Sequence, residues 1–187
     1  MPGIWVFAEN REQTLELLNV GQGLAQEIGG PLTAFAIAEP EADLAQIYID
    51  HGADEVLLLP PLPQDQPRET YIPSLVEAAR QGDPEIFLLG GTLSGNEMAA
   101  RVAAQLKTGL VSGCTALKYE PAERSIILER LIYGGAAAQT LVCKTRPIMA
   151  TIAPRTFAPG APQTGRTGLV RELPAPPASL VKVISRS

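Results

Sequence analysis

The residue types best suited to hold an anion lie in one stretch, GGTLSGN, at residues 90–96. The apolar run at 86–89 precedes it and is typical of a strand that is covered on both faces. Glycines let the backbone bend, and Ser94 followed by Glu97 fits a capping box, which predicts a helix that starts near Gly95. Free backbone N–H groups and the helix dipole at such a start favour a phosphate, another anion or a partner's backbone.

Two interpretations of this turn stay open. It is either a tight connection packed under its neighbours or a loop that faces a ligand or partner at the carboxyl edge of a sheet, where ligands bind in open parallel sheets. Glu9 belongs to the same edge, because it follows the apolar run at 4–8. The Tyr133-Gly134-Gly135 segment has similar alternatives, since two glycines suit both a close backbone approach and a hairpin corner.

Residues for covalent or acid–base catalysis do not assemble into a recognisable set. Gly90 and Gly95 have the spacing of a phosphate-binding P-loop, but Asn96 stands where that loop needs a lysine. His51 is the only histidine, and we expect it at a helix end near the negative pole of the dipole rather than on a metal. No nucleophile elbow, HExxH or CxxC motif is present. We therefore expect no metal site and no catalytic residues.

Composition limits the classes of protein that the chain can belong to. Its 187 residues are 45% apolar and 19% charged, which is typical of a globular domain. A net charge of −5 argues against a general nucleic-acid binder. No apolar run approaches the roughly 20 residues that span a membrane, and the N-terminus does not resemble a secretory signal. Cys114 and Cys143 form no CxxC, so we expect two buried reduced thiols in a cytoplasmic protein.

Apolar runs alternate with helical patterns through the first part of the chain. Four strand–helix units with short connections predict an α/β fold, a three-layer αβα sandwich with a mainly parallel, Rossmann-like sheet. The expected strands span 4–8, 32–38, 56–59, 86–89 and 110–112, and the expected helices span 14–28, 41–51, 69–81 and the stretch from about Gly95 onward. Later runs at 116–119 and 126–132 predict an antiparallel hairpin, and 139–143 and 148–152 are further strand candidates.

The composition changes at Pro154. Six prolines and three glycines lie between Pro154 and Pro177, so we divide the chain into an α/β domain at 1–153 and an arm or linker at 154–187, with a possible terminal strand at 180–184. From Pro154 onward the arm has five basic residues and a single acidic one. We expect this basic arm to fold back on the acidic body or to bind an acidic partner.

The sequence resembles the N-terminal domain of the electron-transfer flavoprotein alpha subunit. The resembling segments follow the family's order, at residues 8–9, 51–56 (HGADEV), 91–95, 97–99, 101–103, 109–110, 130–136 (RLIYGGA) and 152–157 (IAPRTF). The family usually has arginine where Asn96 stands and proline where Ala100 stands. The loss of that arginine removes a charge from the turn that is most suited to a ligand.

The resemblance implies a fold of the adenine nucleotide alpha-hydrolase-like group and a role in electron transfer. It also implies a heterodimer with a beta subunit. In the family, FAD is held mostly by a C-terminal domain, which this sequence does not include. The present chain is then expected to be either an excised domain or a natural stand-alone relative. The residues expected to face the cofactor or a partner are Glu9, Gly90, Gly91, Thr92, Ser94, Gly95, Asn96, Arg130, Tyr133, Gly134 and Gly135.

Three hypotheses follow. The first is a non-catalytic electron-carrier subunit domain that contributes to assembly with the beta subunit, while the flavin supplies the chemistry. The second is a stand-alone adenine-nucleotide-binding module of the same fold, which would use the glycine-rich turn as a phosphate loop. The third, an enzyme of unknown chemistry, has the least support, because no base, nucleophile or metal set can be named.

Overall fold

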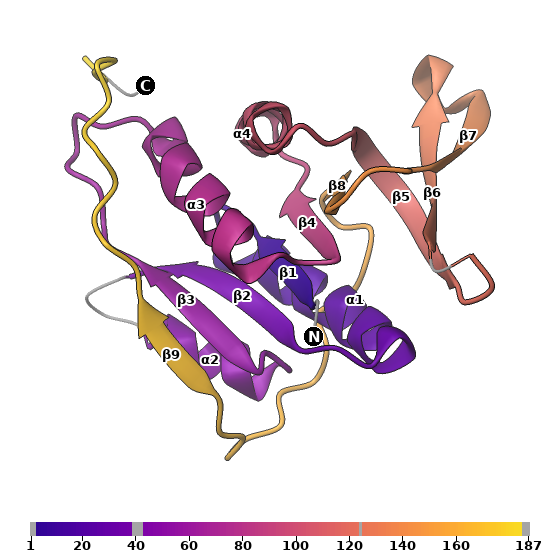
Figure 1. Ribbon diagram of the computed structural model, residues 1–187, viewed down its shortest axis with the longest axis horizontal. Helices are drawn as coiled ribbons and strands as arrows, with labels where there is room; N and C mark the ends of the chain where they lie inside the picture. Colours follow the sequence, from indigo (N-terminus) through magenta and orange to yellow (C-terminus); the bar gives the residue numbers. More distant parts are fainter. Residues whose placement is uncertain (1–2, 39–42, 124, 185–187) are drawn as a thin grey trace.

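The computed structural model describes residues 3–38, 43–123 and 125–184. Within them a nine-stranded sheet has the order β7-β6-β5-β8-β4-β1-β2-β3-β9 (Figure 1). The strands are β1 (Ile4–Phe7), β2 (Leu32–Ile37), β3 (Glu55–Leu59), β4 (Ile86–Gly90), β5 (Leu110–Glu120), β6 (Ser125–Ile132), β7 (Ala137–Val142), β8 (Ile148–Ile152) and β9 (Leu169–Glu172). All neighbours pair in parallel except β6, which is antiparallel to both β5 and β7.

In the same described ranges, four α-helices connect the parallel strands. They are α1 (Arg11–Ile28), α2 (Leu44–Asp50), α3 (Ile72–Gly82) and α4 (Leu93–Leu106), with short 3-10 turns η1 (Arg68–Tyr71) and η2 (Tyr133–Gly135). Part of the helix expected at 41–51 lies outside the described residues. The mainly parallel sheet with helices packed on it confirms the predicted α/β class. No helix within the described part of the chain is long and apolar enough to cross a membrane.

Helix starts differ from the sequence-based expectation because of capping side chains. Asn10 accepts a hydrogen bond from the Gln13 N–H at 2.9 Å, so α1 begins at Arg11 instead of residue 14. At α4 the capping residue is Thr92, whose hydroxyl accepts from the Gly95 N–H at 2.9 Å. The expected capping box of Ser94 with Glu97 is therefore wrong.

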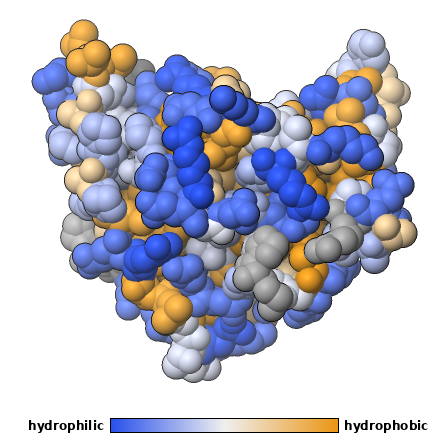
Figure 2. Space-filling view, viewed as in Figure 1, coloured by the Kyte–Doolittle hydropathy of each residue, from blue (hydrophilic) through white to orange (hydrophobic). Residues whose placement is uncertain are grey.

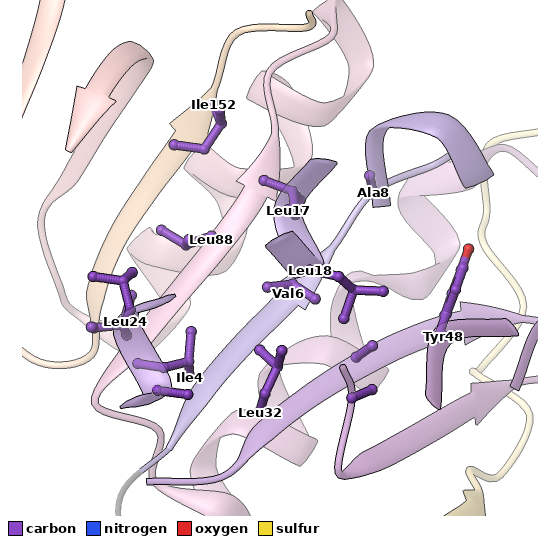
Figure 3. Close-up of a cluster of buried hydrophobic side chains, with 14 of the residues drawn as sticks. Ile4, Val6, Ala8, Leu17, Leu18, Leu24, Leu32, Tyr48, Leu88 and Ile152 are labelled. Carbon is purple, nitrogen blue, oxygen red and sulfur yellow. The ribbon is translucent and has the colours of Figure 1, made fainter. Parts of the chain in front are cut away.

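One hydrophobic cluster fills the space between the sheet and α1 and α2. Figure 3 shows side chains from β1, β2, β4 and β8 pointing toward Leu17, Leu18 and Leu24 of α1, with Tyr48 of α2 at the margin. Each of these residues is buried. Burial on this scale is the main stabilising term for an open sheet.

A second cluster lies on the opposite face, under α3 and α4, and its centre is aromatic. Trp5 and Phe35 meet edge to face with their ring centroids 5.4 Å apart, and Phe35 stacks on Phe87 at 5.7 Å. Ala99, Val102 and Ala103 of α4 are buried, and these small side chains let that helix approach the sheet closely. The two clusters together make the sheet the middle of three layers.

The strand β5 is longer than expected, because one strand unites the two runs predicted at 110–112 and 116–119. Its register with β8 shifts between Val111 and Cys114, and Gly113 there has φ +69°. Near this irregularity β5 changes its partner: it pairs in parallel with β8 up to Cys114 and antiparallel with β6 from Cys114 onward. Figure 1 shows β5, β6 and β7 extending to one side of the helices.

The basic arm folds back on the acidic body, which is one of the two predicted alternatives. Strand β9 pairs in parallel with β3, whereas 180–184, where a terminal strand was expected, has no regular secondary structure. Within the described part of the arm, three ion pairs connect it to the body: Arg166 with Asp54 (3.0 Å), Arg171 with Glu55 (3.3 Å) and Lys182 with Asp65 (3.1 Å). Solvent reaches all three pairs, so each contributes less than about 1 kcal/mol.

Candidate functional site

The carboxylate of Glu9 is fixed at the carboxyl edge of the sheet, just beyond β1. One carboxylate oxygen accepts a hydrogen bond from the Thr92 hydroxyl at 2.5 Å, and the other accepts from the Ser94 hydroxyl at 2.6 Å. Strands β1 and β4 are parallel neighbours, so their carboxyl ends bring these residues together across 83 sequence positions. Short O–H···O⁻ contacts of this kind are the stronger hydrogen bonds of proteins.

The glycines of the turn are required by close backbone packing. A Cβ on Gly95 would overlap the Gly90 carbonyl oxygen, and a Cβ on Gly91 would lie 2.5 Å from the Ile152 carbonyl oxygen. The Gly91 N–H donates to that same Ile152 carbonyl at 2.7 Å. Both contacts are to backbone, which cannot move aside cheaply, so this part of the turn has the character of a tight packed connection.

Asn96 is held by hydrogen bonds at both ends of its side-chain amide. Its Oδ1 accepts from the hydroxyl of the fully buried Thr151 at 2.5 Å, and its Nδ2 donates to the Gly91 carbonyl at 3.2 Å. The Thr151 hydroxyl also accepts from the Gly113 N–H at 2.8 Å. Asn96 therefore connects the turn after β4 to the irregularity in β5.

A cavity of about 510 Å³ opens beside Glu9 and Ser94. Its remaining lining comes from Asn10, Pro67, Arg68, Glu69 and Val183. A second cavity of about 250 Å³ also contacts Glu9 and Arg68 and extends toward Tyr71. The two carboxylates of Glu9 and Glu69 give the larger cavity an acidic wall.

The Arg68 side chain contributes to the lining of both cavities. Its guanidinium donates to the backbone carbonyl of Glu9 at 2.6 Å, which fixes the main chain at the end of β1. Nearby, the Tyr71 hydroxyl donates to the Pro60 carbonyl at 2.7 Å, and burial raises the pKa of that hydroxyl above its usual value. Tyr71 is therefore a neutral hydrogen-bond donor at neutral pH.

Arg130 and the Tyr133-Gly134-Gly135 segment lie elsewhere, on β6 and the turn that follows it. The strands β5 and β8 separate β6 from β4. The Arg130 guanidinium donates to the Gln139 side chain at 2.9 Å and forms no ion pair with any residue that the structure describes. Tyr133 (φ +53°), Gly134 (+65°) and Gly135 (+95°) all have positive φ, as a tight hairpin corner requires.

The predicted candidates thus form two groups. Glu9 and the residues of the 90–96 turn come together at the carboxyl edge, and the Arg130 group occupies the sheet extension. Their roles toward a cofactor or partner stay predictions. The sequence did not indicate that Arg68, Thr151 or Gln13 belongs to the first group, because only folding brings them there. Gln13 is buried and donates to the Ile152 carbonyl at 3.0 Å.

His51 ends α2 as expected, with its Nδ1 2.8 Å from the Ile47 carbonyl oxygen. Within the described ranges, no group of three or more His, Cys, Asp or Glu side chains is arranged to hold a metal ion. The two cysteines are free thiols, and Cys114 is buried as expected, but Cys143 is partly exposed, which corrects the prediction that both are buried.

This difference predicts selective alkylation. Burial raises the pKa of the Cys114 thiol to about 11, although the Arg130 charge lowers it slightly. At pH 8 we expect iodoacetamide to modify Cys143 in the folded protein and to leave Cys114 intact, because only a thiolate reacts. Intact-mass spectrometry should show one added group under native conditions and two in denaturant. Modification of Cys114 at a comparable rate in the folded protein would contradict the burial described here.

Comparison with known proteins agrees with this fold and these motifs. The family model described as "Electron transfer flavoprotein domain" matches residues 4–178. The electron transfer flavoprotein subunit alpha of Clostridium acetobutylicum is 34% identical over 162 residues, covering 83% of this chain and 48% of the relative.

Two further relatives give the same result. Protein FixB of Clostridium saccharobutylicum is 36% identical over 165 residues (83% of this chain, 48% of the relative). The electron transfer flavoprotein subunit alpha of Megasphaera elsdenii is 32% identical over 177 residues (91% and 52%). The chain spans about half the length of the curated relatives it matches. Since the family model covers nearly all of the described fold, the chain belongs to the electron transfer flavoprotein family and is similar to its alpha subunits.

Proposed function

We propose that the chain acts as the N-terminal domain of an electron-transfer flavoprotein alpha subunit. It assembles with a beta subunit and takes part in FAD-dependent electron transfer without catalytic residues of its own. The observation that carries this proposal is the family match over residues 4–178, which includes the turn after β4, the β6–β7 hairpin and the start of the arm. In this proposal the chain provides a binding surface for the beta subunit and positions the other parts of the complex.

The residues at the carboxyl edge do not fit the diphosphate of FAD. A diphosphate needs free hydrogen-bond donors at a helix start, but the hydroxyls of Thr92 and Ser94 already donate to Glu9. Glu9 and Glu69 also place negative charge on the wall of the adjoining cavity. We therefore assign the main FAD contacts to a C-terminal domain of the alpha subunit. We assign no electron-transfer step to the residues of this chain.

The surface that we assign to the beta subunit is the β6–β7 hairpin, defined by Leu131, Tyr133 and Val142. Tyr133 is 84% exposed and Leu131 is 57% exposed. Figure 2 shows hydrophobic residues between hydrophilic ones on the part of the surface that the sheet extension forms. Aromatic and aliphatic side chains that are solvent-exposed in an isolated domain are typical anchors of a subunit interface. Arg130 is half-buried on the same hairpin and can add a charged hydrogen bond to a partner carboxylate.

A double substitution tests this assignment. Leu131→Ser with Tyr133→Ser should weaken the complex with the beta subunit at least about tenfold, because both anchors lose their apolar area. The matched control is Leu169→Ser on β9, at the opposite edge of the sheet, where the leucine is also exposed. Affinities are measured by isothermal titration of the purified beta subunit into each chain.

The control should bind like the unmodified chain. Failure of the unmodified chain to bind the beta subunit would reject the proposed function. Binding that the double substitution leaves unchanged would reject only the hairpin assignment. Thermal unfolding of all three chains shows whether any loss of binding comes from misfolding.

A further inference from the structure

The start of α4 has the groups of an anion-binding site, and the chain itself occupies it. Thr92 is the capping residue and Ser94 is in the first turn, where the helix dipole favours negative charge. Both hydroxyls donate to the carboxylate of Glu9, one to each oxygen. A phosphate at the same place would use the same two hydroxyls.

The connection between Glu9 and this helix is rigid on both sides. The Arg68 guanidinium holds the Glu9 carbonyl, so the main chain at the end of β1 is fixed. The Thr92 hydroxyl that donates to Glu9 also accepts from the Gly95 N–H, so its orientation is fixed by the helix. The carboxylate therefore occupies a defined position and does not simply lie on the surface.

Among the residues that the structure describes, the cavity beside this contact has two carboxylates and one basic side chain in its lining, so its charge is net negative. Glu69 lines it together with Glu9, and Arg68, the basic residue of this lining, donates to the Glu9 carbonyl. An incoming phosphate would have to displace one carboxylate from its hydroxyl partners and approach a second carboxylate. Each of these steps opposes binding electrostatically.

We propose that Glu9 is an internal substitute for an anionic ligand and that it keeps the carboxyl edge of this domain closed to phosphate-bearing molecules. The residue thereby completes the start of α4 without a nucleotide. This function is independent of the proposed assembly with a beta subunit, because it concerns the isolated chain. It makes Glu9 the residue that decides whether this edge can bind an anion.

The test compares two carboxylates of the same cavity. Glu9→Ala should open the helix start, so that inorganic phosphate raises the melting temperature of the variant relative to chloride at equal ionic strength. The unmodified chain and Glu69→Ala, which removes one negative charge from the same cavity but leaves the hydroxyls bound to Glu9, should show no such rise. By titration, phosphate should bind Glu9→Ala at least about tenfold more tightly than either of them.

A second pair keeps the test decisive if the alanine variant does not fold. Glu9→Gln retains the size of the side chain, removes its charge and replaces one of its two acceptor oxygens with an N–H donor, so that one hydroxyl loses its acceptor. Glu69→Gln is its control. Phosphate should then stabilise Glu9→Gln alone. The proposal is overturned if phosphate binds the unmodified chain equally well, if no Glu9 variant gains phosphate binding, or if the Glu69 variants gain as much.

Discussion

Replacing Phe87 by alanine is expected to lower the free energy of unfolding by about 4 kcal/mol. Phe87 lies in β4, in the middle of the sheet, and is fully buried. It stacks on Phe35 and meets Trp5 edge to face at 6.0 Å, so the truncation removes aromatic contacts and leaves a cavity at the centre of the second cluster. Denaturant unfolding followed by tryptophan fluorescence measures this change, because Trp5 is the only tryptophan.

The matched control is Leu131→Ala on the exposed hairpin, which should change the free energy of unfolding by less than about 0.5 kcal/mol. Equal effects of the two substitutions would mean that the aromatic cluster is not the core of this face.

The second large effect is expected for Gly95→Ala, which should destabilise the domain by about 3 kcal/mol. The new Cβ would overlap the Gly90 carbonyl oxygen, so either the start of α4 or the end of β4 must shift. The shift would also disturb the Thr92 cap and its contact with Glu9. The same unfolding measurement applies.

Gly23→Ala is the control, since Gly23 also lies inside a helix but a Cβ added there would meet nothing within 4 Å. Alanine at this position should stabilise the domain by about 0.5–1 kcal/mol, because it is the better helix former. A stabilising effect at Gly95 would contradict the close packing of the turn.

The alternation of strands and helices could be predicted because each buried strand is a short apolar run bounded by glycine or proline. The same patterns indicated the α/β class and the antiparallel hairpin, whereas the charge of the basic arm indicated its fold-back only as one of two alternatives. The position of β9 was not predictable, because the sequence LVRE at 169–172 becomes a strand only through pairing with β3. Tertiary pairing rather than local propensity decides such an edge strand.

The candidate site could likewise be predicted only in part from the sequence. Glu9 and the turn after β4 could be assigned to one edge, since parallel strands end together. The local pattern of Ser94 and Glu97 nevertheless indicated the wrong cap. In the structure the Ser94 hydroxyl donates to the carboxylate of Glu9, 85 positions away in the sequence, and Thr92 caps the helix instead. A local sequence pattern cannot predict a contact between residues so far apart in the chain. Through this contact the chain's own carboxylate lies at the start of α4, in a turn for which the sequence left open a packed connection or a loop that faces a ligand or partner.

The central claim is that the chain contributes assembly surface while the flavin is held elsewhere. The most direct measurement mixes the chain with the beta subunit and a C-terminal alpha domain, separates the species by size-exclusion chromatography, and records the flavin absorbance of each. We predict an equimolar complex that retains FAD, and an isolated chain that retains none. An isolated chain that binds FAD stoichiometrically, or a flavin-containing complex from which the chain is absent, would contradict the account.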